Sequence, residues 1–276
     1  MSNTFTGRIS RELARQYGLE AVRIIQDGFY QTPTGQHVVI QEAVARSVEK
    51  MMAYPPDKPF EPQMAGPDPA QIDVRNETTL SAAQRLLIDG FKPVVLNFAS
   101  ATHPGGGFLS GARAQEEYLA RSSGLYACLK DQPMYPYHLQ HSDPLATSYM
   151  LYSPDVPVFR GDDGRLLEQP YQVGIITAAA PNASHMVGRA AEIELAFRER
   201  IAKVLWIGQQ HAHDAIVLGA WGCGAFGNDG KMVSRLFQQA LNGDYRGAYR
   251  RVIFAIVDWS DDRKFIGPFE ETFGIK

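Results

Sequence analysis

Short apolar segments alternate with amphipathic segments over most of this chain. Residues 93–100, 171–180, 215–219 and 251–259 are rich in apolar side chains. Stretches with helical periodicity, such as residues 116–130 and 188–211, separate them. A strand that is apolar throughout is buried on both faces of its sheet, because helices in the connections cover both sides. The alternation therefore predicts an α/β fold, with a mixed, mostly parallel sheet between two helical layers.

The first 70 residues have a different pattern. Apolar spacing predicts helices over residues 8–27 and 42–53. Residues 54–69 contain six prolines, which exclude regular structure and indicate a connector. We therefore expect an N-terminal helical accessory segment with its proline-rich connector (1–70), followed by an α/β core (71–276).

Composition limits the classes of function. The longest apolar runs, such as 252–257, are too short to span a bilayer, and the first residues do not resemble a secretory signal, so we expect a cytoplasmic protein without membrane contact. Two cysteines suggest neither a disulfide framework nor a cysteine zinc site. The net charge of −3 argues against direct nucleic-acid binding. Phosphates of a ligand would have to be held locally, by backbone amides or helix N-termini.

The later of two glycine-rich loops spans residues 219–230 and contains Gly-Cys-Gly-Ala-Phe-Gly at 222–227. The dinucleotide-binding interpretation of this G-x-G-x-x-G fails on placement, because that motif belongs to the first strand–helix unit and Asp258 comes too late to be its acidic partner. Glycines after a strand and before a helix still allow close approach of a pyrophosphate. Phe226 would pack on a sugar or base, or simply cover the core. Cys223 indicates a small buried thiol more than a nucleophile.

The earlier loop spans residues 97–117 and contains three consecutive glycines, Gly105–Gly107, followed by Gln115-Glu116-Glu117. Consecutive helical residues point about 100° apart, so two adjacent carboxylates reach one cleft only from a first turn. An isolated acidic pair there would be explained by the helix dipole alone.

In combination these residues resemble the signature of poly(ADP-ribose) glycohydrolases: a strand, Gly-Gly-Gly, seven residues (108–114), then Gln-Glu-Glu. A late glycine-rich loop with a phenylalanine also fits that family. The resemblance covers roughly residues 71–260, is closest to the bacterial type, and implies a macrodomain-like three-layer α/β/α fold. Animal enzymes have Asp-Phe-Ala-Asn where this chain has Asn-Phe-Ala-Ser at 97–100.

The resemblance also implies roles for residues. Glu117 would be the general acid that protonates the leaving 2′-oxygen and then activates water, while Glu116 would bind ribose hydroxyls. No metal and no cofactor would be needed. The implied substrate-binding residues are Asn97, Ser100, Gly105, Gly106, Gly107, Gln115, Gly222, Cys223, Gly224, Ala225, Phe226, Gly227 and Asn228.

The expected activity is hydrolysis of ribose–ribose O-glycosidic bonds, mainly from the chain terminus, with release of ADP-ribose. Poly(ADP-ribosyl)ated proteins would be partners, in a bacterial DNA damage response. Two alternatives stay open. A macrodomain that binds ADP-ribose without cutting it would keep the glycine loops and lack the acidic pair. A mono-ADP-ribosyl hydrolase would share the fold and differ at the Gln-Glu-Glu signature.

Overall fold

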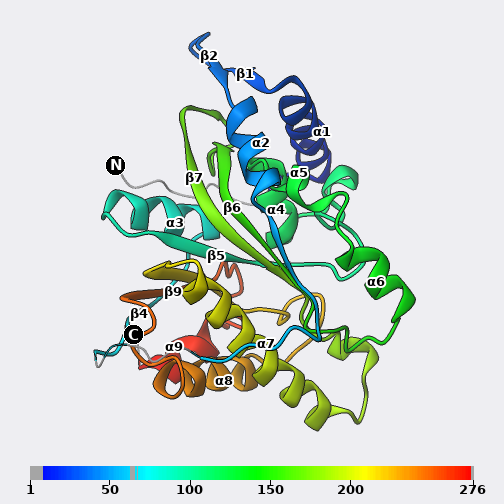
Figure 1. The fold of residues 1–276 in the computed structure, drawn as a ribbon, viewed down its shortest axis with the longest axis vertical. Helices are drawn as coiled ribbons and strands as arrows, with labels where there is room; N and C mark the ends of the chain where they lie inside the picture. The colour runs from blue at the N-terminus through cyan, green and yellow to red at the C-terminus, as the bar shows by residue number, and fades with distance from the viewer. Residues whose placement is uncertain (1–8, 63–65, 67, 275–276) are drawn as a thin grey trace.

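The computed structural model describes residues 9–62, 66 and 68–274, and a seven-stranded sheet forms the centre of this part of the chain (Figure 1). The strand order is β3-β6-β7-β5-β8-β9-β4. Pairs β5–β7, β5–β8, β8–β9 and β4–β9 are parallel, whereas β3–β6 and β6–β7 are antiparallel. The prediction of a mixed, mostly parallel sheet is confirmed. The strands are β3 (Met52–Tyr54), β4 (Gln71–Arg75), β5 (Pro93–Phe98), β6 (Met150–Arg160), β7 (Leu166–Ala178), β8 (Ala215–Leu218) and β9 (Arg251–Ala255).

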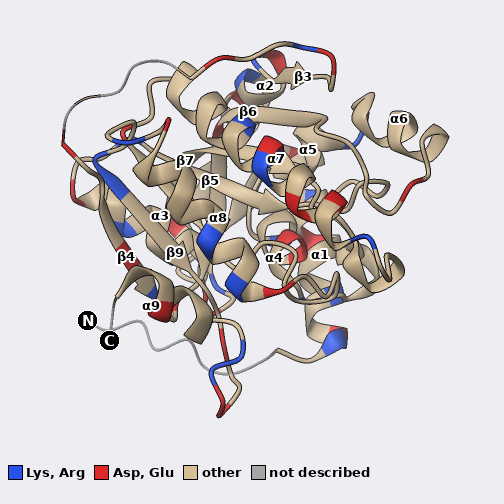
Figure 2. Cartoon of the chain, turned by 90° about the horizontal axis from the view of Figure 1, so that it is seen from below, with Lys and Arg blue, Asp and Glu red and all other residues tan. Residues whose placement is uncertain are grey.

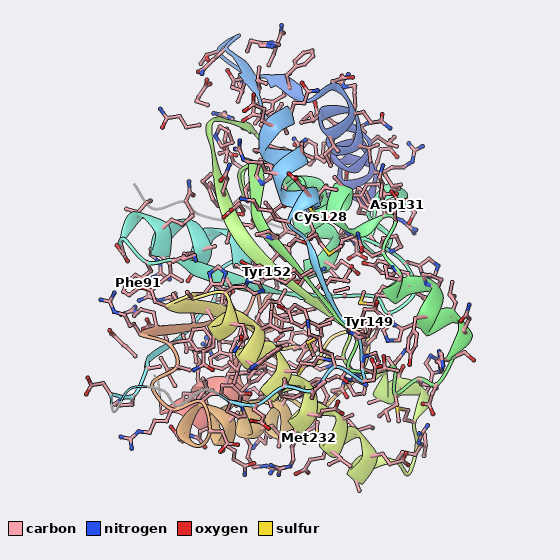
Figure 3. The ribbon with its side chains drawn as sticks, viewed as in Figure 1. Phe91, Cys128, Asp131, Tyr149, Tyr152 and Met232 are labelled. Carbon is pink, nitrogen blue, oxygen red and sulfur yellow. The ribbon has the colours of Figure 1, made fainter. Side chains whose placement is uncertain are left out.

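Helices pack on both faces of this sheet, which confirms the predicted three layers. Along β5, Val94 and Leu96 pack into the core beneath one helical layer, and Val95 packs into the core beneath the other. Figure 3 shows the dense packing of side chains around Tyr152 of β6. One layer contains α7 (Ala190–Gln210), α8 (Gly230–Asn242) and α9 (Gly267–Phe273); the other contains α3 (Thr79–Ile88), α4 (Gln115–Ser122), α5 (Leu125–Leu129) and α6 (Met134–Gln140).

The N-terminal segment forms α1 (Arg11–Asp27), the hairpin β1 (Phe29–Gln31)–β2 (His37–Val39) and α2 (Gln41–Glu49), which lie together at one end of the molecule (Figure 1). The hydroxyl of Ser10 caps α1, and Gly28 ends it in the left-handed conformation. The segment has its own small core but also supplies β3, which pairs with β6 at one edge of the central sheet. The division of the chain at residue 70 remains a prediction.

Two predicted helices have different ends in the structure. The helix expected over 42–53 stops at Glu49, and residues 52–54 form β3 instead. The helix expected over 116–130 is interrupted at Ser123, whose extended backbone bridges to Val158 of β6. The Gly124 amide then donates to the Pro157 carbonyl at 2.8 Å. Contacts with β6, which a local pattern does not contain, cause this break.

Basic and acidic residues are mixed over the described part of the chain. Figure 2 shows Lys and Arg interspersed with Asp and Glu over the ribbon in that view. Among the described residues, no helix combines the length and apolar character that crossing a membrane requires.

Candidate active site

A cavity of about 650 Å³ lies across the carboxyl ends of the parallel strands. Phe98 at the end of β5, Ala180 beyond β7, Ala220 beyond β8 and Ala255 at the end of β9 all line it. The first turn of α4 and the loop between β8 and α8 form further walls. Ligands bind at this edge in open α/β sheets, so both predicted loops meet where chemistry is expected.

Both glutamates of the Gln-Glu-Glu sequence line this cavity, and each is held by a backbone amide from a different segment. Glu116 Oε2 accepts from Ser100 N at 2.7 Å, just beyond the end of β5. Glu117 Oε1 accepts from Gly107 N at 2.9 Å. The two side chains are 4% and 8% exposed. Their position in the first turn of α4 lets adjacent carboxylates share one cavity.

Burial changes the chemistry of Glu116 strongly. Loss of solvation and, to a smaller extent, the neighbouring charge of Glu117 raise its pKa to about 8, against the opposing effect of the Ser100 amide. Glu116 therefore retains a proton near neutral pH. Because a protonated carboxyl can donate a hydrogen bond as well as accept one, Glu116 suits a contact with a sugar hydroxyl.

Gly105 and Gly106 explain why the sequence needs glycine next to the acids. Both residues have positive φ, 73° and 61°, where other residues are strained. A Cβ on Gly106 would lie 2.9 Å from Glu116 Oε2 and closer still to Glu117 Oε1. The glycine therefore makes space for the two carboxylates themselves. Gly107 contributes the amide that fixes Glu117.

Gln115 and Asn97 lie where they support the acids. Gln115 accepts from Phe98 N at 2.9 Å and donates to Leu96 O at 2.7 Å, so it fastens the start of α4 to β5. Asn97 is fully buried behind Glu116, and its Nδ2 lies 3.5 Å from Glu116 Oε1. These contacts show positioning of the glutamates, while direct contact of either amide with substrate remains a prediction.

The loop after β8 presents backbone N–H groups to the cavity. Gly222 has φ 74°, and Asn228 Nδ2 donates to the Gly222 and Pro181 carbonyls at 2.9 and 2.8 Å, which fixes the turn. Asn228 is itself buried, and neither it nor Gly227 lines the cavity. Within the described part of the chain, five residues of this loop line the cavity and have a backbone N–H without an acceptor: Ala220, Gly222, Gly224, Ala225 and Phe226.

Comparisons with known proteins agree with this geometry. The family model of the microbial-type PARG (poly(ADP-ribose) glycohydrolase) catalytic domain matches residues 19–161. The crystal structure of the poly(ADP-ribose) glycohydrolase from Thermomonospora curvata is 43% identical, with a TM-score of 0.91 over 95% of this chain and 100% of that chain. The chain belongs to the microbial-type poly(ADP-ribose) glycohydrolase family.

Further relatives in this family have been crystallised with ligands. The Thermomonospora curvata enzyme bound to the inhibitor ADP-HPD is 42% identical, with a TM-score of 0.88 over 94% of this chain and 99% of that chain. The Deinococcus radiodurans enzyme in complex with ADP-ribose is 37% identical, with a TM-score of 0.79 over 83% of this chain and 96% of that chain. A comparison with curated proteins found no match. The family match begins at residue 19, well before the limit of about 71 that the sequence motifs indicated.

Cys223 and the histidines do not form a second reactive centre at this glycohydrolase site. Burial raises the pKa of the Cys223 thiol to about 12, and this residue does not line the cavity. His211 and His213 bond to the hydroxyls of Tyr54 and Tyr152, at 2.8 Å in both cases. No group of three or more His, Cys, Asp or Glu with metal-site geometry occurs among the residues that the structure describes.

Sequence reasoning missed the wall that follows β9. Trp259 and Phe265 line the cavity from a loop without a regular pattern. Asp258 folds this loop: its Oδ2 accepts from Phe265 N at 2.7 Å and from Ile266 N at 3.0 Å. The only available signal was an acidic residue followed by Trp-Ser, which is typical of a local side chain–backbone turn.

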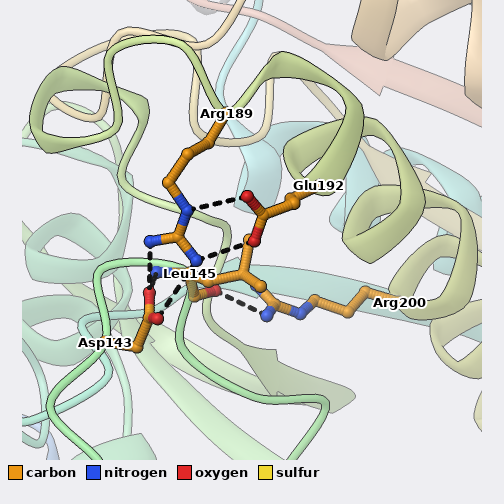
Figure 4. A network of polar contacts seen from close by, with 5 residues as sticks. All are labelled: Asp143, Leu145, Arg189, Glu192 and Arg200. Atoms are coloured by element: carbon orange, nitrogen blue, oxygen red, sulfur yellow. Dashed lines mark hydrogen bonds and ion pairs between the residues drawn. The ribbon is translucent and has the colours of Figure 1, made fainter.

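A second missed feature lies behind Phe226. Arg189 binds both oxygens of Asp143 at 3.1 Å, and Arg200 donates to the Leu145 carbonyl at 2.6 Å (Figure 4). This network holds the segment before β6 against the start of α7. The loop between β7 and α7 is also bound to Phe226, because Ser184 N donates to the Phe226 carbonyl at 3.1 Å. The predicted contact of the Phe226 ring with substrate stays a prediction, although the residue does line the cavity.

Proposed function

We propose that this chain hydrolyses the ribose–ribose O-glycosidic bonds of poly(ADP-ribose) and releases ADP-ribose. The observation that carries this proposal is the pair of buried glutamates in the first turn of α4, facing one cavity with a glycine loop. The relatives from Thermomonospora curvata and Deinococcus radiodurans are poly(ADP-ribose) glycohydrolases, which supports the same activity here. A macrodomain that only binds ADP-ribose has no use for two buried acids at this position.

Glu117 is the proposed general acid, which protonates the leaving 2′-oxygen and then activates water. Its Oε1 is fixed by the Gly107 amide, whereas its Oε2 has no hydrogen-bond partner among the described residues. One oxygen is therefore positioned, and the other is a buried oxygen without a partner, whose missing hydrogen bond we assign to the substrate. Glu116, which retains its proton, binds ribose hydroxyls and adds no second negative charge beside the reacting centre.

The free N–H groups at 222 and 224–226 are the proposed site for the pyrophosphate. Backbone amides beside a helix N-terminus bind phosphate without a basic side chain. This arrangement suits a chain with a net charge of −3. The proposal also includes the remaining predicted residues, which contact the substrate or shape its site: Asn97, Ser100, Gly105–Gly107, Gln115, Cys223, Gly227 and Asn228.

Cleavage mainly from the chain terminus is part of the proposal. A terminal unit can insert its pyrophosphate and ribose into a closed cavity, whereas an internal unit must pass both ends of the polymer out of it. Ile9 and Tyr17 line the cavity, which supports a role of the N-terminal segment in closing it. We further propose that poly(ADP-ribosyl)ated proteins are its partners in the cytoplasm, in a bacterial DNA damage response without direct binding of nucleic acid.

The deciding experiment is incubation with poly(ADP-ribose) and, separately, with mono-ADP-ribosylated protein, with products identified by mass. Glu117→Gln should keep its affinity for ADP-ribose and lose polymer hydrolysis by at least about 10²-fold, as expected for loss of a general acid. Glu49→Gln, an exposed change at the end of α2, is the control and should have wild-type activity.

Three outcomes would contradict the proposal. Polymer binding without products would favour the binding module. Cleavage of the mono-ADP-ribosylated protein alone would favour the mono-ADP-ribosyl hydrolase. Full activity of a correctly folded Glu117→Gln protein would place the general acid elsewhere.

A further inference from the structure

The cavity continues beyond the two glutamates into a part that the proposed terminal unit does not need. This extension runs along α4 toward α1 and the turn between β6 and β7. Tyr17, Arg113, Tyr118, Arg121 and Gly161 line it. It lies on the α4 side of the sheet, whereas the proposed pyrophosphate loop leads into α8 on the opposite side. Glu116 and Glu117, in the first turn of α4, line the same cavity as both of these groups of residues.

Arg121 is a buried cation without a carboxylate partner. It lies four residues after Glu117 and so on the same face of α4. Its side chain is 6% exposed, and its one hydrogen bond is a long one, from Nη1 to the Ala112 carbonyl at 3.4 Å. No ion pair joins it to any described residue, and the residues outside the described part of the chain include no Asp or Glu. Its guanidinium lies 5.6 Å from the centroid of the Tyr118 ring and is attracted by the charge of Glu117, but neither residue accepts its N–H groups. Buried N–H donors without good acceptors are costly, which indicates that a ligand supplies the anion.

Arg113 adds a second cation at the mouth of this extension. It lies four residues before Glu117, is exposed, and uses one donor, Nη1, for the Ile9 carbonyl at 2.9 Å. Its other nitrogens have no acceptor among the described residues. A guanidinium has five N–H donors in a planar fork that matches phosphate oxygens, so both arginines have free capacity for a diphosphate.

The other charges of the extension are already satisfied. Arg160 pairs with Glu20 at 2.7 Å. Asp162 accepts from the Thr78 hydroxyl at 2.8 Å and from the Tyr118 hydroxyl, so both of its oxygens are occupied. Apart from Glu117 and from Asp162, which has no counter-ion but whose oxygens are both occupied by hydroxyls, the free charges facing this part of the cavity are positive.

We propose that Arg113 and Arg121 bind the diphosphate of the ADP-ribose unit on the leaving side of the scissile bond. The inference rests on the proposed glycohydrolase activity. The bond that is cut joins the terminal ribose to the adenosine ribose of the preceding unit, so that unit must extend past Glu117, away from the pyrophosphate loop. Its diphosphate then meets the two free guanidinium groups. They recognise polymer as distinct from any other ADP-ribose glycoside.

Two substrates separate this role from a role at the terminal unit. One is poly(ADP-ribose), and the other is ADP-ribose with an α-linked benzyl group at C1″. Its leaving group, benzyl alcohol, is also poor and requires protonation, but it carries no phosphate. Arg113→Gln should lower kcat/KM on polymer about tenfold, as expected for loss of a charged hydrogen bond, and leave the benzyl substrate unaffected. Arg15→Gln, which removes an exposed charge from α1, is the matched control and should not change either rate.

Arg121→Lys keeps the buried charge without the planar fork, and should show the same polymer-selective loss; a thermal melt checks its folding. Equal losses on both substrates would overturn the proposal, because the arginines would then act on the terminal unit or on Glu117. So would an Arg113→Gln protein with wild-type kcat/KM on polymer. Failure of the wild-type protein to cut either substrate would instead refute the proposed glycohydrolase activity.

Discussion

Replacing Gly106 with alanine tests whether space beside the carboxylates sets the rate. The residue has φ 61°, which costs a non-glycine residue about 1–2 kcal/mol of folding free energy. The new Cβ would also lie 2.9 Å from Glu116 Oε2 and closer to Glu117 Oε1, so both carboxylates must retreat. A displacement on the order of 1 Å at reacting groups costs about 10²-fold in rate. We therefore expect a folded protein, slightly less stable, with hydrolysis reduced about a hundredfold.

The matched control is Gly35→Ala. Gly35 has φ 87°, but no atom lies within 4 Å of the position of its Cβ. It reproduces the backbone strain without the collision. Melting temperatures and kcat/KM on poly(ADP-ribose) should show similar destabilisation of both variants, with loss of activity confined to Gly106→Ala. A Gly106→Ala protein with nearly wild-type kcat/KM would refute the reasoning, because the carboxylates would then tolerate the extra carbon.

Other predictions follow from the same geometry. EDTA should leave activity unchanged; loss that magnesium restores would contradict the mechanism. If amides rather than basic side chains hold most phosphates, polymer affinity should fall only slightly with salt, and early digests should contain ADP-ribose beside long chains. Early mid-length oligomers would indicate internal cutting. The pKa of Glu116 is about 8 in the folded protein, above its ordinary value of 4.5. The folded protein therefore keeps a proton that the unfolded chain releases. The free energy of unfolding should fall as the pH rises from about 4.5 to about 8. Glu116→Gln should remove this fall, so the melting temperature of the variant should rise relative to that of the wild type between pH 5 and pH 8. If the difference between the two melting temperatures is the same at both pH values, the prediction is wrong.

The sequence predicted the elements whose pattern is long or wholly apolar. β5, β8 and α7 belong to this class, because burial on two faces or over several turns leaves a clear record in the residues. β3 and α9 were missed, since three and seven residues are too few for a period to appear. The break at Ser123 depends on a bridge to Val158, 35 positions away in sequence, and no local pattern contains it.

For the site, glycines and acids carried the information. Backbone freedom at Gly106 and Gly222 is visible in the sequence as a residue type, so both loops were predicted. Arg121 gave no such signal, because an arginine one turn after a glutamate is typical of any exposed helix face. That it is buried and forms no ion pair with a described residue becomes apparent only in three dimensions. Trp259 was likewise hidden in a loop whose shape Asp258 determines through hydrogen bonds.

Two adjacent glutamates can serve one cavity because their carboxylates are held by segments that meet only in the folded protein. Gln115 fastens the first turn of α4 to β5, which brings Glu116 to the Ser100 amide. Glu117 instead depends on Gly107, whose loop continues into a short helix at Phe108–Ser110. α1 packs on this short helix, where a Cβ on Gly18 would lie 2.7 Å from the Phe108 carbonyl. The N-terminal segment therefore contacts the loop that positions the proposed general acid, and its close packing there gives it a part in the geometry of the site.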